Sequence, residues 1–161
     1  MNERMGILQQ RQIEAEVIKP IYEEMAARFG PETAQEVLRA AIEKSAIAAG
    51  KSFAADLDNR TDLNAFRNLL HLWTKGGALE IEDLHVADEQ YDFNVTRCKY
   101  SEMYREMGLG EIGHILSCQR DGSFCEGFDS RINLDRSQTI MGGAAHCDFR
   151  FSFDPAREKK D

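Results

Sequence analysis

The chain has 161 residues, a hydrophobic content of 42% and a formal net charge of −8, a composition that suits one domain able to bury a core without disulfides or metal. Its 28 acidic against 20 basic residues argue against a nucleic-acid or anionic-membrane surface, because both need clustered Lys and Arg. No stretch approaches the roughly 20 apolar residues of a membrane span.

The first 77 residues predict helices. Apolar residues recur near steps of four over residues 6–28, and Pro20 is expected to kink this helix or split it in two. Pro31 suits the first turn of a second helix that runs to about residue 57. A third helix is expected to begin at the cap Thr61–Asp62 and to end at Gly76–Gly77.

After residue 77 the hydrophobic period changes to two, which is typical of strands. Residues 79–86 and 91–96 predict a first hairpin, and two short helices follow at 101–107 and about 110–124. The final hairpin pairs residues 132–140 with 146–153 across Gly142–Gly143. In its second strand alternation places Cys147 on one face, with three phenylalanines, and Asp148 on the other.

Together these elements predict a single α+β domain over residues 1–161. A helical half, 1–77, packs on a roughly four-stranded antiparallel sheet with short helices between two hairpins, 78–153, and residues 154–161 form a tail. The apolar N-terminal helices fit either an intramolecular core or a homo-oligomer interface.

The N-terminal residues Met1 to Arg4 lead into a mixed-charge stretch without the apolar core of a signal peptide. We therefore expect a cytoplasmic protein whose four cysteines stay reduced. Their positions, 98, 118, 125 and 147, contain no CxxC pair, and no HxxxH or HxH spacing occurs. We accordingly expect no metal and no cofactor.

Cys98 is the first candidate for chemistry. It ends a predicted strand, follows Arg97 and precedes a helix, and both a cationic neighbour and a helix N-terminus lower a thiol pKa. The alternative is a cysteine that merely packs at a strand end. Tyr100 and Tyr104 are four residues apart, so they share a helical face where their hydroxyls orient a substrate or their rings seal the core.

The acid–base candidates are carboxylates beside apolar residues. Glu126 lies between Phe124 and Phe128, where burial would raise its pKa and let it act as a general acid, whereas Asp121 before Gly122 is an ordinary turn signal. Asp148 is a candidate base.

Among the strand-associated arginines, Arg97, Arg136 and Arg150, any could bind a carboxylate through a bidentate fork. Asp148 could also pair with Arg136 or Arg150 across the hairpin.

Several blocks in the C-terminal half occur together and in order. They are residues 95–109 (VTRCKYSEMYREMGL), 117–128 (SCQRDGSFCEGF), 134–139 (LDRSQT) and 147–151 (CDFRF). Over roughly residues 90–153 the chain thereby resembles the L-2-amino-thiazoline-4-carboxylic acid hydrolase family. Lys99 stands where a proline is expected and Ser137 where a threonine is common. The resemblance implies hydrolytic opening of a cyclic amidine, on a bacterial route towards cysteine.

The implied substrate is a small heterocycle that carries a carboxylate. Arg97 or Arg136 would bind that carboxylate, with Tyr100, Tyr104 and Cys147 as further contacts. Cys98 would attack the amidine carbon, or Asp148 would activate water, and Glu126 would donate the proton that ring opening requires. One competing interpretation is a non-catalytic small-molecule binding or sensing domain. Another is a redox or metal protein that uses Cys98, Cys118 and Cys147.

Overall fold

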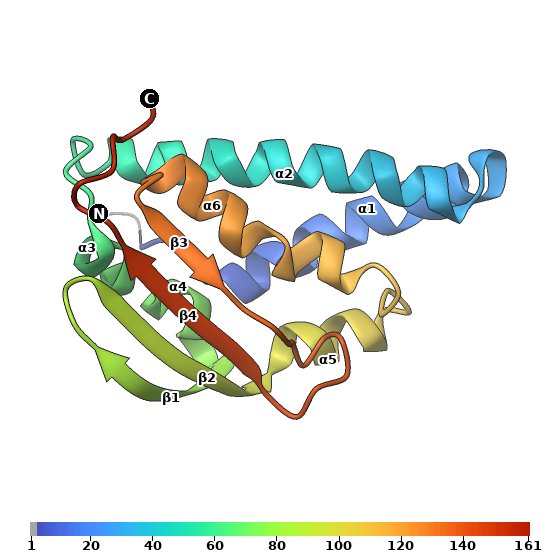
Figure 1. The fold of residues 1–161 in the computed structure, drawn as a ribbon. Coiled ribbons are helices and arrows are strands. Elements are labelled where there is room, and N and C mark those ends of the chain that lie inside the picture. The colour runs from blue at the N-terminus through green and yellow to red at the C-terminus, as the bar shows by residue number, and fades with distance from the viewer. Residues whose placement is uncertain (1–2) are drawn as a thin grey trace.

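The computed structural model describes residues 3–161, and its N-terminal half is helical (Figure 1). Helix α1, Ile7–Phe29, and helix α2, Pro31–Ala55, form a long antiparallel pair. Gly30 joins them with φ of +86°, a conformation that glycine adopts without strain. The predicted split at Pro20 is wrong. Helix α1 continues through it, because residues on both sides, Ala15 and Tyr22, are buried in the core that α1 shares with α2.

Three short elements lead from the helical pair to the sheet. Helix α3, Leu63–Leu69, begins as predicted at Asp62, whose side chain accepts a hydrogen bond from the Ala65 amide at 2.7 Å. Helix α4, His71–Thr74, and the 3₁₀ turn η1, Lys75–Gly77, complete the segment. The predicted single third helix is therefore divided at Leu70.

The sheet has four antiparallel strands in the order β1-β2-β4-β3. Their bounds are Leu79–Val86 for β1, Gln90–Cys98 for β2, Ile132–Asp135 for β3 and Cys147–Phe153 for β4. Strand β3 is shorter than predicted, since residues 136–146 form a loop that carries Arg136 towards α6. The fold is α+β, as expected.

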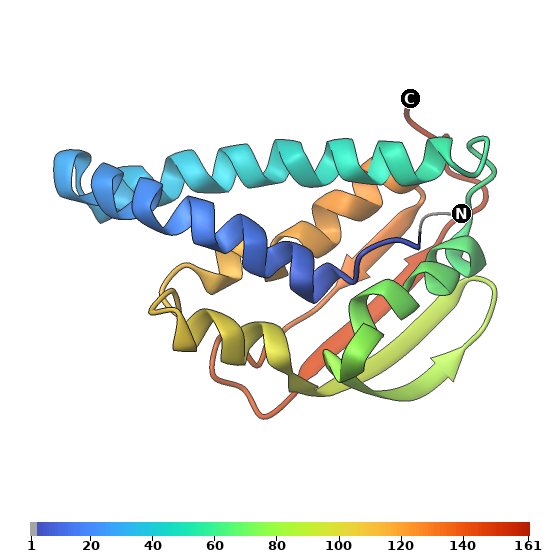
Figure 2. The same cartoon turned by 180° about the vertical axis from the view of Figure 1, so that it is seen from behind.

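Helices between the two hairpins complete the layer that covers one face of the sheet (Figure 2). Helix α5 is Lys99–Glu106, the π-helical turn η2 is His114–Cys118 and helix α6 is Arg120–Phe128. The helix predicted at 110–124 thus starts later and ends later. Within residues 3–161, no helix combines the length and the apolar character needed to cross a membrane.

Helices α2 and α6 pack at glycines. A Cβ on Gly127 would lie 2.0 Å from the Ile47 carbonyl oxygen, and a Cβ on Gly50 would lie 2.2 Å from the Phe124 carbonyl oxygen. The two backbones therefore touch directly, which places one face of α6 against α2 and turns another towards the sheet.

Candidate functional site

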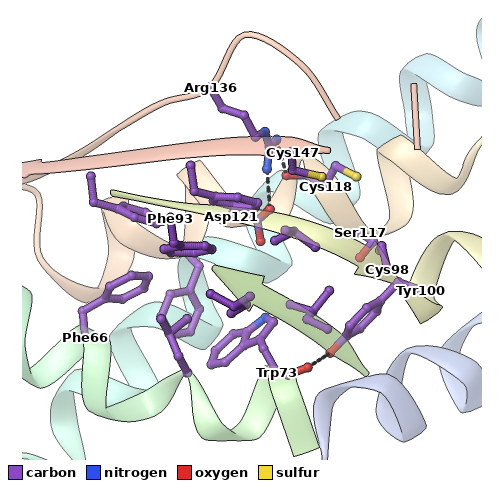
Figure 3. Close-up of a pocket in the computed structure, with 17 residues that line it drawn as sticks. Phe66, Trp73, Phe93, Cys98, Tyr100, Ser117, Cys118, Asp121, Arg136 and Cys147 are labelled. Carbon is purple, nitrogen blue, oxygen red and sulfur yellow. Dashed lines mark hydrogen bonds and ion pairs between the residues drawn. The ribbon is translucent and has the colours of Figure 1, made fainter. Parts of the chain in front are cut away.

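A cavity of about 70 Å³ lies between the sheet and the covering helices (Figure 3). Most of its wall is apolar and aromatic, with Trp73 from α4, Phe93 from β2 and Phe149 from β4. The polar and thiol side chains in the wall come from β2, α5, η2, α6, the 136–146 loop and β4. They are Cys98, Tyr100, Ser117, Cys118, Asp121, Arg136 and Cys147. Residues distant in sequence thus converge on one hollow.

Asp121 and Arg136 form an ion pair in this wall. Arg136 Nη1 donates to Asp121 Oδ2 at 2.6 Å, and Arg136 Nη2 donates to the Cys118 carbonyl at 3.0 Å. The guanidinium also lies 4.9 Å from the centre of the Phe149 ring. The side chains are only 25% and 11% exposed, and burial raises the pKa of Asp121 although Arg136 opposes the shift. The pair offers a carboxyl group able to exchange a proton beside a cation able to bind a carboxylate.

Three thiols face the same cavity, those of Cys98, Cys118 and Cys147, named below the cavity thiols. Burial raises the pKa of each. The lowered pKa expected for Cys98 is therefore wrong. The Arg97 guanidinium does not face the thiol, because it is exposed and pairs with Glu102 at 3.0 Å.

Glu126 does not reach the cavity. It is exposed on α6, whereas its neighbours Phe124, Cys125 and Phe128 are buried. The expectation of apolar surroundings is wrong because helical periodicity turns position 126 outward. Asp121, five residues earlier and therefore on another side of the helix, occupies the inward position instead.

Asp148 lies on the sheet face opposite to Cys147, as alternation predicted, and is not part of the cavity wall. The amides of Ser137 and Gln138 donate to it at 3.0 and 2.9 Å, and the Ser137 hydroxyl also donates. Burial raises the pKa of Asp148, but these hydrogen bonds outweigh it and hold the pKa below its usual value. The suggested pairing with Arg136 or Arg150 does not occur, and Asp148 instead holds the start of the 136–146 loop.

The two candidate tyrosines, Tyr100 and Tyr104, lie in different parts of the structure. Tyr100 lines the cavity, and its hydroxyl donates to the Trp73 carbonyl at 2.9 Å. Tyr104 is fully buried in the helical core and is absent from the cavity wall. Arg97, being exposed, is absent from the wall too.

A family model described as L-2-amino-thiazoline-4-carboxylic acid hydrolase matches residues 10–151. The chain belongs to this family. The match extends well beyond residues 90–153 into the helical half, and membership of the L-2-amino-thiazoline-4-carboxylic acid hydrolase family supports a hydrolase activity. No curated protein sequence matches the chain.

Three solved structures were found to be similar to this member of the hydrolase family, each with a TM-score below 0.5. The phenol-responsive sensory domain of the transcription activator PoxR, bound to phenol, has 13% identity and a TM-score of 0.47, with 85% of this chain and 73% of that chain covered. Trafficking protein particle complex subunit 3 from Naegleria fowleri, covalently bound to palmitic acid, has 9% identity and a TM-score of 0.49, with 94% and 98% covered. The SO2144 H-NOX domain from Shewanella oneidensis has 14% identity and a TM-score of 0.43, with 88% and 76% covered.

The principal cavity residue that sequence reasoning passed over is Asp121. Its position before Gly122 indicated a turn, but Cys118, Asp121 and Phe124 are spaced three apart and so share one helical side. That spacing was the available signal.

Across residues 3–161 of this hydrolase-family chain, no three His, Cys, Asp or Glu side chains are grouped as metal ligands.

Proposed function

We propose that this protein hydrolyses a small cyclic amidine that carries a carboxylate, such as 2-amino-thiazoline-4-carboxylate, by attack at the amidine carbon. The observation that carries the proposal is the convergence of Asp121, Arg136 and the cavity thiols on one hollow with aromatic walls. Family membership supports the same reaction class.

The size of the cavity suits such a substrate. The cavity of about 70 Å³ is larger than a single water molecule requires, as a ligand of one small ring needs. The walls of Trp73, Phe93 and Phe149 offer flat apolar surfaces against which a planar ring packs.

Arg136 is the residue proposed to bind the substrate carboxylate. Its guanidinium is the cation in the cavity wall, and it already holds a carboxylate, that of Asp121, at 2.6 Å. A substrate carboxylate that takes over this interaction frees Asp121 for proton transfer. The carboxyl group of Asp121 can then protonate the ring nitrogen, because burial favours its protonated form.

Two routes of attack are compatible with these groups. In the covalent route a cavity thiol adds to the amidine carbon, its proton passes to a base, the ring opens at the C–N or C–S bond, and water releases the thiol. The raised pKa of each thiol means that this route needs a base at the moment of attack. In the direct route, Asp121 in its ionised form accepts a proton from water as the hydroxyl adds to the same carbon. Asp121 then returns that proton to the leaving nitrogen or sulfur as the C–N or C–S bond of the ring breaks.

The test is turnover of 2-amino-thiazoline-4-carboxylate, followed by mass spectrometry of the ring-opened product. We expect Asp121→Asn to lower kcat by about 100-fold or more, which is the usual contribution of general acid–base catalysis. The matched control is Glu126→Gln on the same helix, which should retain activity because Glu126 is exposed. Full turnover by all three single Cys→Ala variants of the cavity thiols would exclude the covalent route.

The alternative is a domain that binds a small aromatic or heterocyclic molecule without turnover. The predominantly apolar wall and the neutral thiols favour it. Ligand-induced thermal stabilisation without any ring-opened product, across a panel of cyclic amidines, would support this alternative over the hydrolase.

A further inference from the structure

A second, smaller cavity of about 20 Å³ lies on the other side of Asp121. It shares Trp73, Ser117, Asp121 and Phe124 with the main cavity. The rest of its wall is Arg11 from α1, Arg120 from α6 and two alanines of α2, Ala46 and Ala49. The space is large enough for a water-sized group.

Both arginines of this small cavity are buried, each with 7% of its surface exposed. Arg11 Nη1 donates to the two carboxylate oxygens of Glu14 at 3.1 and 3.0 Å. Arg120 Nε donates to the Leu116 carbonyl at 2.8 Å, and Arg120 Nη2 donates to Glu14 at 3.3 Å. Within residues 3–161, three guanidinium nitrogens of this pair make no hydrogen bond: Arg11 Nε, Arg11 Nη2 and Arg120 Nη1.

The charges around the two cavities do not balance. Arg11 and Arg120 share one carboxylate, that of Glu14, while Arg136 takes the carboxylate of Asp121. With Asp121 ionised, three guanidinium groups thus face two carboxylates and one positive charge remains; with Asp121 protonated, two remain. Burial and the nearby Arg11 lower the pKa of Arg120 to about 10, which still leaves it charged at neutral pH. Two buried guanidinium groups that share one carboxylate are costly, so the cluster favours an added negative charge.

We propose that the small cavity binds a monovalent anion between Arg11 and Arg120. The anion is a free ion, such as formate or a halide, since the proposed function places the substrate carboxylate at Arg136. The guanidinium nitrogens that make no hydrogen bond supply the donors, and the excess positive charge with Asp121 ionised favours a single negative charge. Asp121, which borders the same space, is already paired with Arg136 and so repels the anion less.

The anion would also assist the chemistry, a consequence that rests on the proposed function. A negative charge close to Asp121 favours the protonated form of its carboxyl group. The protonated form is the one that can donate a proton to the substrate. Arg11 and Arg120 would then act as positioning residues that hold the anion. Through the anion they would favour the protonated form of Asp121.

The direct test is binding of bromide and formate to the purified protein. In crystals soaked in bromide, we expect an anomalous peak between Arg11 and Arg120. In solution at constant ionic strength, calorimetry should detect the binding of formate. The absence of both the peak and the formate heat would overturn the proposal.

Two substitutions give opposite expected effects, which a merely structural role would not produce. Arg11→Met removes a charged donor and should weaken formate binding at least about tenfold, since one hydrogen bond to a charged group is involved. Glu14→Gln increases the excess positive charge and should tighten binding. Arg28→Met on the exposed part of α1 is the matched control and should leave the affinity unchanged. Equal affinity in all four proteins, including the unmodified one, would refute the assignment.

Competition identifies the source of the anion. A formate-dependent rise in the KM of the carboxylate-bearing substrate that persists in Arg11→Met indicates competition at Arg136. A rise that Arg11→Met abolishes would place the substrate carboxylate in the small cavity and overturn the assignment of a free ion. An unchanged KM with an altered kcat indicates a separate ion. An enzyme without turnover would refute the proposed function, but it would leave the bromide and formate measurements fully informative.

Discussion

The contact between α2 and α6 leads to a quantitative prediction about Gly127. An added Cβ would lie 2.0 Å from the carbonyl oxygen and 2.8 Å from the carbonyl carbon of Ile47, both backbone atoms that cannot rotate away. To reach 3.0 Å, the helices must separate by about 1 Å, which breaks close packing along the contact. Gly127→Ala should therefore be strongly destabilising.

The expected change in the free energy of unfolding is the difference between two effects. Overpacking of this kind costs about 1–3 kcal/mol and more when backbone is involved, while Ala in place of Gly gains about 1 kcal/mol of helix propensity. We expect a net loss of about 2 kcal/mol in the free energy of unfolding, or a Tm lower by about 4–8 °C. Urea denaturation followed by circular dichroism measures it.

Gly122→Ala is the control, since it lies on the same helix and a Cβ there meets nothing within 4 Å. It should raise stability by about 0.5–1 kcal/mol. The reasoning fails if Gly127→Ala and Gly122→Ala have unfolding midpoints that agree within error.

Three further outcomes are expected. Asp62→Ala should lower the free energy of unfolding by about 1 kcal/mol in urea titrations, because the Ala65 amide loses its capping acceptor. Burial raises the pKa of Asp129, but hydrogen bonds from Arg131 and Thr61 outweigh it and lower the pKa, so the unfolded state binds more protons in acid. The free energy of unfolding should then fall as the pH drops below about 4. Urea titrations from pH 6 to 3 should show a smaller fall for Asp129→Asn than for the unmodified protein, and an equal fall in both would contradict this account. The cavity thiols should react with iodoacetamide at least about tenfold more slowly in the native protein than in urea at pH 7.5, as judged by mass spectrometry.

Periodicity was enough to predict the layers of this fold. The change of period near residue 77 separates helices from sheet, and alternation from Cys147 to Phe153 assigns Cys147 to the inner face and Asp148 to the outer one. These are local properties, because a side chain's direction on a strand or helix depends on its own element.

Helical spacing groups Asp121 with Cys118 and Phe124, but it does not say whether that side of the helix or the side of Glu126 faces the cavity. Both carboxylates have apolar residues nearby in sequence, but the side of α6 that faces the cavity is set by its contact with α2 at Gly50 and Gly127. The ion-pair partner of Arg97 likewise depends on tertiary structure, because Glu102 lies on the next helix, α5. The turn of the chain after β3, which brings Arg136 to Asp121, has no periodic signal at all.

The strand order has a consequence for how the cavity comes into being. Strand β4, the last of the four in chain order, lies between β2 and β3 and supplies Cys147, Phe149 and Phe151 to the wall. Until β4 inserts, β3 lacks its partner in the sheet and the hollow lacks a side. Cys98 and Cys118 would meanwhile be open to water and to oxidants, so during synthesis and refolding these thiols are chemically vulnerable in a way that the finished protein is not.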